Sequence, residues 1–286
     1  MNIDEEANED TFNINKVLKT LFSSIKEISN EKRIELIYEM DSTIPRKLRG
    51  DYESLLSLLS KILTFVFQNT DKKEIVLSLS SVEDFLYEEF ISFRIQETNI
   101  DKEKLLAFLK VHASQEIEML DGKIVDDDNI SDIHLSIPFK NFELGFRRHY
   151  RLPDKDVVGK KILLLCSNDQ TGQSLKKMFK YFHYEVHVGM EELKKNGNDL
   201  SLYDILIISE KIFTEKNKEM INKVQERAPL KCVLLREPYD LDDDIKTDSE
   251  HFIKPITQEK IFDLITSLYD DKSSTGTSDT TQIENA

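Results

Sequence analysis

The sequence is poor in glycine and cysteine, and each scarcity argues against a class of site. Only eight glycines occur among 286 residues, which leaves little material for the glycine-rich loops whose backbone amides cradle phosphate groups. The two cysteines, Cys166 and Cys232, lie inside apolar runs, so we expect them to be reduced core residues. No spacing of cysteine and histidine resembles a zinc site. The sequence therefore predicts no metal and no cofactor.

The sequence also lacks long apolar runs and any excess of positive charge. No apolar stretch approaches the about 20 residues that cross a bilayer. The acidic start, Met1–Asp10, has neither the basic nor the apolar region of a signal peptide. We therefore expect a cytoplasmic protein without membrane contacts. The net charge of −15 opposes attraction to the phosphates of nucleic acid, which is not an expected partner.

The apolar content, 39% of the residues, is enough for packed cores, and the length fits about two domains. Residues 140–158 show no sustained helical or strand periodicity and contain glycine and proline, so we expect a linker there. This places one domain at 11–139 and a second at 159–271. The acidic start, 1–10, and the small polar residues of 272–286 are expected to be disordered.

The second half of the chain alternates apolar strands with amphipathic helices. Strands are predicted at Ile162–Cys166, Glu185–Val188, Tyr203–Ser209, Cys232–Leu235 and His251–Ile253. Continuous apolar strands separated by helical patterns are typical of a parallel sheet that is covered on both faces. The expected fold class is α/β, with a flavodoxin-like doubly wound sheet of five parallel strands whose active site lies at their carboxyl ends.

Two phrases of this half, Asp204–Ser209 and Phe252–Pro255, resemble two strands of the receiver domain of two-component response regulators. The resemblance covers nearly all of 159–271. It implies that Ser209 stands where the family has its phosphorylated aspartate, and that Cys166 and Ser167 stand where acidic residues bind magnesium. A serine without an adjacent base is a weak nucleophile, and oxygen-rich magnesium sites need carboxylates.

The same resemblance assigns the remaining positions of a degenerate receiver pocket. It places Arg236 at the position of a small hydroxyl residue, Lys254 at the family's lysine before a proline, and His251 at the aromatic switch position. Two cations then face the pocket. Glu210 or Asp169 can pair with them and hold the domain in one conformation; alternatively, Lys254 is solvated or structural.

The first half of the chain combines helical and strand patterns in another order. Helices are predicted at Phe12–Lys32 and Leu55–Phe67, and strands at Ile34–Met40, Glu74–Ser80 and Phe90–Ile95. This order, and above all the phrase Glu31–Asp51, resembles the ATP-binding domain of sensor histidine kinases. The resemblance spans about 11–139 and implies an α/β sandwich.

The nucleotide motifs of that family are altered here. The resemblance puts Lys61 and Phe65 where two asparagines stand, one of which coordinates the nucleotide's magnesium. It puts Glu97 at the aspartate that reads adenine and Asn99 where glycines follow. A second glycine-rich segment has no counterpart. These differences argue against productive ATP binding.

From the losses in both halves, we predict a two-component signalling protein that is not an enzyme. It would combine a pseudokinase domain with a pseudo-receiver and act by protein contact with a histidine kinase, a response regulator or itself. One alternative is a divergent hybrid kinase fragment that binds ATP through Glu97, with Asp169 restoring metal binding. Another is a small-molecule sensor that uses the former ATP cleft.

Overall fold

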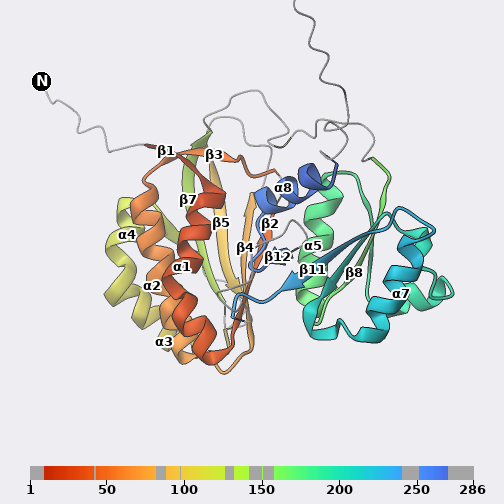
Figure 1. Cartoon of the computed structure of the whole chain (residues 1–286). Helices are drawn as coiled ribbons and strands as arrows, with labels where there is room; N and C mark the ends of the chain where they lie inside the picture. Colours follow the sequence, from red (N-terminus) through yellow and green to blue (C-terminus); the bar gives the residue numbers. More distant parts are fainter. Residues whose placement is uncertain are drawn as a thin grey trace, which may run out of the picture.

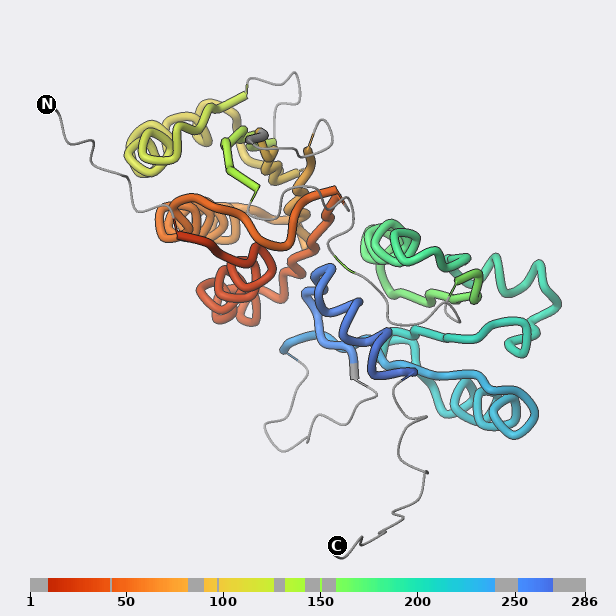
Figure 2. Tube along the Cα trace, turned by 90° about the horizontal axis from the view of Figure 1, so that it is seen from above, coloured from red at the N-terminus to blue at the C-terminus, as the bar shows by residue number. Residues whose placement is uncertain are grey.

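The computed structural model describes residues 10–41, 43–81, 88–96, 98–125, 132–141, 150, 158–239 and 251–269. These residues form a mixed α/β structure with two β-sheets, each carrying its own helices (Figure 1). We call the first sheet with its helices α1–α4 unit A, and the second sheet with its helices α5–α8 unit B. Seen from above, helix α8 of unit B lies next to α1 of unit A (Figure 2).

Sheet A has seven strands in the described part of the chain. They are β1 (Asp10–Asn13), β2 (Glu35–Met40), β3 (Lys47–Gly50), β4 (Glu74–Ser81), β5 (Glu88–Gln96), β6 (Lys123–Ile124) and β7 (Ile133–Asn141). The strand order is β1-β3-β7-β5-β4-β2, with β6 on β7. Only the β2–β4 pair is parallel among the described pairs. Strand β2 stands at the end of the strand order and is an edge strand.

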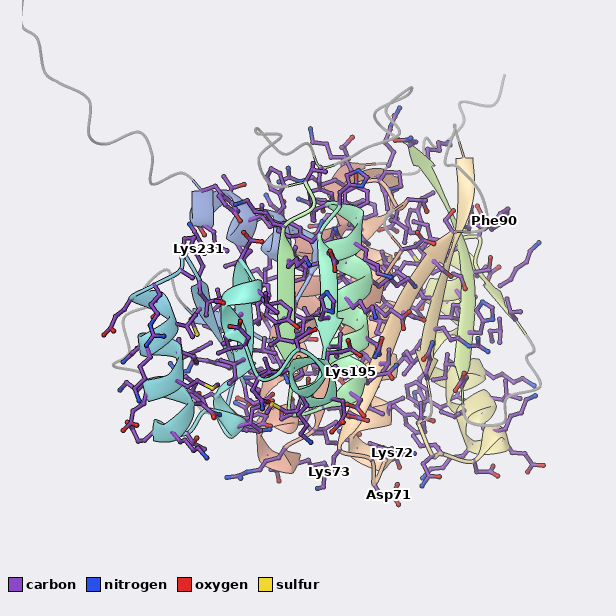
Figure 3. All side chains as sticks on the ribbon, turned by 90° about the vertical axis from the view of Figure 1, so that its right-hand side faces the viewer. Asp71, Lys72, Lys73, Phe90, Lys195 and Lys231 are labelled. Atoms are coloured by element: carbon purple, nitrogen blue, oxygen red, sulfur yellow. The ribbon has the colours of Figure 1, made fainter. Side chains whose placement is uncertain are left out.

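Helices cover one face of sheet A. They are α1 (Ile14–Lys32), α2 (Tyr52–Asn69), α3 (Lys102–Phe108), the π-helical turn η1 (Leu109–Ala113) and α4 (Ser114–Met119). Apolar residues of α1 recur at helical spacing and are buried against the sheet, as Leu18, Leu21 and Ile25 show. The opposite face is more polar, although it carries the buried Ile37 and Val76 and, near the start of β5, the exposed Phe90 (Figure 3). Antiparallel sheets commonly leave one face to solvent in this way.

Sheet B is fully parallel in its described pairs, with the order β12-β11-β10-β8-β9. Its strands are β8 (Lys161–Leu165), β9 (Glu185–Val188), β10 (Ile205–Ser209), β11 (Lys231–Arg236) and β12 (His251–Ile253). Helices α5 (Asp169–Tyr181) and α8 (Gln258–Tyr269) pack on one face. Helices α6 (Met190–Lys195) and α7 (Glu215–Gln225), with the short turns η3 (Leu200–Leu202) and η4 (Glu210–Ile212), belong to the other.

The mixed α/β fold with a parallel sheet in the second half is confirmed. Three local expectations need correction. Asp10, expected to be disordered, begins β1 and pairs with Gly50. Lys140 and Asn141, expected to belong to a linker, continue β7 because they pair with neighbouring strands. Tyr150, in the same predicted linker, is buried.

Other expectations lie outside the described residues, including those for 1–9 and 272–286. Within the part of the chain that is described, no helix is both long enough and apolar enough to cross a membrane.

Candidate functional site

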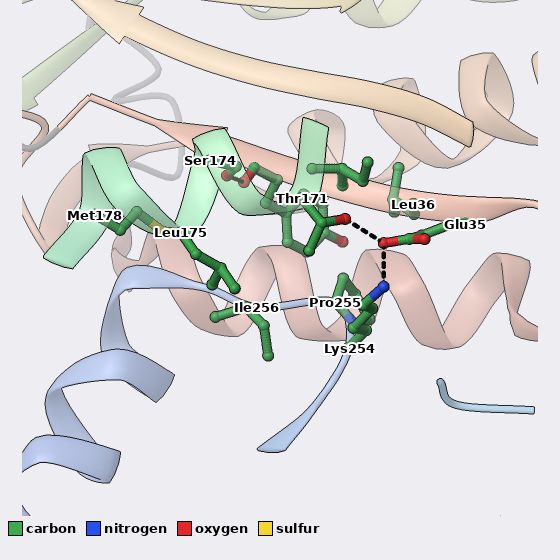
Figure 4. Close-up of a pocket in the computed structure, with 11 residues that line it drawn as sticks. Glu35, Leu36, Thr171, Ser174, Leu175, Met178, Lys254, Pro255 and Ile256 are labelled. Atoms are coloured by element: carbon green, nitrogen blue, oxygen red, sulfur yellow. Dashed lines mark hydrogen bonds and ion pairs between the residues drawn. The ribbon is translucent and has the colours of Figure 1, made fainter. Parts of the chain in front are cut away.

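The two units meet where α5 runs along the edge strand β2 (Figures 1 and 4). The hydroxyl of Ser174 donates to the backbone oxygen of Tyr38 at 2.5 Å. The hydroxyl of Thr171 donates to Glu35 Oε1 at 2.6 Å. An edge strand carries backbone groups that lack a neighbouring strand. Helix α5 supplies side-chain partners to this edge and covers it.

Lys254 lies at the centre of this contact. Its side chain is 3% exposed, and its ammonium group donates to Glu35 Oε1 at 2.6 Å and to Glu237 Oε1 at 2.9 Å (Figure 4). Glu237 follows β11, is buried, and also accepts from Lys211 at 3.1 Å. Burying a lone charge is costly, whereas a charge with opposite partners and hydrogen bonds can be held inside a protein.

The electrostatics of the site favour a charged lysine. Burial alone lowers the pKa of Lys254, but the carboxylates of Glu35 and Glu237 outweigh it and hold that pKa above its ordinary value. The cavity at the contact measures only about 10 Å³, which is room for about one water molecule. The charge of Lys254 is therefore neutralised by internal partners, one of which, Glu35, belongs to unit A.

The uncharged members of the predicted receiver pocket lie nearby, at the carboxyl ends of β8 and β10. Ser209 is buried, and its hydroxyl donates to the hydroxyl of Ser167 at 3.1 Å. Burial raises the pKa of the neighbouring Cys166 thiol to about 12, although the charge of Lys254 acts in the opposite direction. This corner of the site offers hydroxyl and thiol groups in place of a carboxylate.

The charged members of the predicted pocket are distributed differently. Arg236 is buried, and its Nε donates to Glu210 Oε2 at 2.9 Å. Asp169 is exposed as the first residue of α5. His251 begins β12, and its side chain lies outside the described residues. The structure therefore joins Arg236 to Glu210, while Lys254 turns to Glu35 and Glu237.

Three residues of the site were missed from the sequence: Glu35, Thr171 and Glu237. One signal was available, because Glu35 is a charged residue in an otherwise mostly apolar strand that is buried almost throughout. The pairing itself left no local trace, since Lys254 and Glu35 are 219 positions apart.

The second candidate region surrounds Lys61 and Phe65 on α2. The ammonium group of Lys61 forms an ion pair with Glu116 and donates to the backbone oxygen of His112 at 3.1 Å. Burial raises the pKa of Glu116, but the hydrogen bond from Lys61 and further contacts lower it below its ordinary value. The ring of Phe65 stacks on Phe108 with centroids 4.0 Å apart. Both α2 residues therefore face the helical segment α3–η1–α4.

Asn99 changes one of the arguments made from the sequence. It has φ 56°, a left-handed conformation that glycine favours and that asparagine also tolerates. Its amide donates to Asp71 Oδ1 at 2.7 Å. The left-handed turn is thus present without glycine at this position. Glu97, two residues earlier, lies outside the described residues.

One of the comparisons with known proteins bears on the fold. No family model matches the sequence, and no curated protein matches it. Among solved structures, 92% of the chain resembles full-length ShkA in complex with AMPPNP, with a TM-score of 0.64 at 14% identity. The fold is histidine-kinase-like. The chain spans 58% of the length of ShkA.

Two further similarities cover about half of the chain. The histidine kinase AdeS of Acinetobacter baumannii matches over 48% of this chain and 70% of its own, with 14% identity and a TM-score of 0.37. The catalytic domain of the histidine kinase ThkA matches over 46% of this chain and 97% of its own, with 15% identity and a TM-score of 0.36.

These findings contradict the sequence-based prediction that the chain is not an enzyme. That prediction rested on altered motifs, whereas the fold over 92% of the chain resembles that of ShkA, which was solved with AMPPNP bound. The prediction relied too heavily on single residue changes at motif positions that were assigned by resemblance alone. The left-handed turn at Asn99 shows how a residue change can preserve local geometry.

Proposed function

We propose that this chain acts in two-component signalling as a divergent hybrid histidine kinase fragment. In this proposal a kinase-type domain extends from Asp10 to Asn141, a linker follows it, and a receiver-like domain occupies 159–271. The observation that carries the proposal is the fold likeness to ShkA, which extends over 92% of the chain and so includes both units. The order of sheet B also supports it, because it corresponds to the flavodoxin-like order 2-1-3-4-5.

In this proposal the receiver-like domain controls the kinase-type domain by direct docking. The support is the contact of Lys254 with Glu35. The receiver resemblance assigns Lys254 to the phosphoryl pocket, and in this chain the kinase-type domain supplies one of its two acceptors. A response regulator or a second histidine kinase is the partner class that suits such a protein.

The proposed nucleotide site is the region between α2 and the segment α3–η1–α4. Lys61 is 44% exposed, so its ammonium group can turn from Glu116 to a nucleotide phosphate. The stacked rings of Phe65 and Phe108 offer an aromatic surface for a base. A lysine would then supply positive charge at a position where the resemblance expects a metal-binding asparagine.

Thermal unfolding of the full chain with and without Mg-ATP tests this proposal. A ligand at 100 times its Kd stabilises a protein by about 2.7 kcal/mol, which raises the midpoint by several degrees. We expect such a rise for the natural chain and a smaller one for Lys61→Ala. Lys110→Ala, which removes an exposed charge from the adjacent turn η1, should behave like the natural chain. Absence of any Mg-ATP effect would contradict the nucleotide site.

A further inference from the structure

A groove of about 420 Å³ lies between α1 of unit A and α8 of unit B, two helices that are neighbours in both Figure 1 and Figure 2. Its volume falls within the range of small-molecule sites, about 300–1,000 Å³. Phe22 and Ile253 contribute apolar surface, and Tyr38 and Lys254 lie at its inner side. The groove is separate from the region around Lys61.

Lysines dominate the charge of this groove. Lys16, Lys19 and Lys26 line it from α1. They are three and seven residues apart and extend for about 15 Å along the helix axis. Among the residues that the structure describes, their ammonium groups make no hydrogen bond or ion pair. Such a row of unpaired cations is notable in a chain with a net charge of −15.

A fourth lysine is fixed in the wall formed by α8. Lys260 Nζ donates to the backbone oxygens of Ile253 at 2.8 Å and Pro255 at 2.9 Å. Burial, together with the charge of Lys19 across the groove, lowers the pKa of Lys260 to about 8. These carbonyl contacts hold a partly desolvated cation in place, so a bound anion would relieve the repulsion between the two walls.

The acidic residues of the groove do not balance these cations. Glu259 is engaged elsewhere, since it forms an ion pair with Arg46 and accepts from Asn13 at 3.1 Å. Lys254 is likewise neutralised by its own partners. Asp263 remains as the acidic residue that faces the lysines.

We propose that this groove binds a small ligand with two or more phosphate groups, which Lys16, Lys19, Lys26 and Lys260 contact. Ammonium groups are effective phosphate binders because they act as compact point charges with several donors. The apolar surface of Phe22 and Ile253 suits the uncharged part of such a ligand. Because the groove has one wall from each unit, the ligand would also strengthen the docking of unit B on unit A. This inference does not rest on the proposed function.

The test is calorimetric titration of the full chain with inorganic tripolyphosphate, without magnesium and at constant ionic strength. We expect saturable binding that the double variant Lys19→Ala/Lys26→Ala weakens about tenfold or more, because one hydrogen bond to a charged group contributes roughly 1.5–3 kcal/mol. Both lysines are exposed, so the variant should fold. The control Lys218→Ala removes an exposed charge from α7 and should leave the affinity unchanged.

Further arms of the titration separate the possible ligands and the two sites. ATP in EDTA should bind at least as tightly as tripolyphosphate, and tighter binding would assign a contact to its base. Lys61→Ala should not change tripolyphosphate binding, so failure at the kinase-type site is distinguishable from failure here. The inference is overturned if tripolyphosphate does not bind saturably, if Lys218→Ala weakens it equally, or if only an acidic peptide binds.

Discussion

Lys254 is a residue whose environment differs sharply from that of ordinary surface lysines. It has left water almost completely, and two carboxylates from different parts of the chain compensate for that loss. Lys177 makes a useful comparison. It also bridges unit B to β2, by pairing with Glu39 at 2.9 Å, but its side chain is 51% exposed. The same interface therefore contains one lysine–glutamate pair that is shielded from water and one that is exposed to it.

Replacing the two lysines should separate these situations. Lys254→Met leaves Glu35 buried without its cation and leaves Glu237 with Lys211 alone, and breaking a buried pair in this way costs about 3–5 kcal/mol. Lys177→Met removes a solvent-screened pair that contributes roughly 0–1 kcal/mol. Urea unfolding of both variants measures the difference. Equal losses of stability would show that Lys254 is not electrostatically special.

At the scale of elements, α5 is confined on two sides, by β2 of unit A and by β9 of its own sheet. Gly172 lies tightly against β9, because a Cβ atom added there would lie 2.8 Å from Val188 Cγ1. Glycine costs a helix about 1 kcal/mol relative to alanine. Its presence in α5 therefore follows from packing, and not from helix propensity.

A double-mutant cycle tests this packing. We expect Gly172→Ala to destabilise the natural chain by about 1–3 kcal/mol, because overpacking outweighs the gain in helix propensity. In a Val188→Ala background the added methyl group has room, so the same change should be neutral or stabilising. Free energies of unfolding for the four proteins give the coupling. An identical effect of Gly172→Ala in both backgrounds would refute the contact.

Sequence reasoning succeeded for elements with strong periodicity and failed for short or distant features. The apolar strands of sheet B and the helices α1 and α2 could be placed from their patterns. Helix α6 has six residues, too few to show a helical period, and it was not predicted. The end of β7 was missed because Lys140 and Asn141 look like loop residues, although β3 and β5 pair with them.

The candidate site shows the same limit. The phrase before Pro255 singled out Lys254 as a pocket residue, but its partner Glu35 follows from how α5 lies on β2. No local pattern encodes that placement. Glu210 and Asp169 illustrate the ambiguity, since both were candidate partners for the two cations, and the structure pairs Glu210 with Arg236.

At the scale of the whole molecule, the contacts between the units couple two cores. Tyr150 adds to the coupling, because its hydroxyl accepts from Asn15 of α1 at 2.6 Å while its ring packs among aromatic side chains of unit B. Glu259 of α8 bonds to Asn13 at the start of α1. Each unit therefore loses hydrogen bonds if the other unfolds.

We expect the natural chain to unfold in a single calorimetric transition, with the van't Hoff enthalpy equal to the calorimetric one. Ser174→Arg puts a bulky charge into the buried contact with Tyr38 and should split this transition into two. Gln173→Arg adds the same side chain at the adjacent exposed position of α5 and should not. Two independent transitions in the natural chain would mean that the units are not coupled.

The cover that α5 gives to β2 has a consequence for self-association. A bare strand edge recruits strands from other molecules and is a starting point for aggregation. Strand β2 is six residues long and buried along nearly its whole length. Without unit B, unit A would expose this strand edge, and other copies of the chain could pair with it. Docking of unit B should therefore limit the growth of filaments. A signal that releases α5 would uncover the edge of β2 and make such self-association possible.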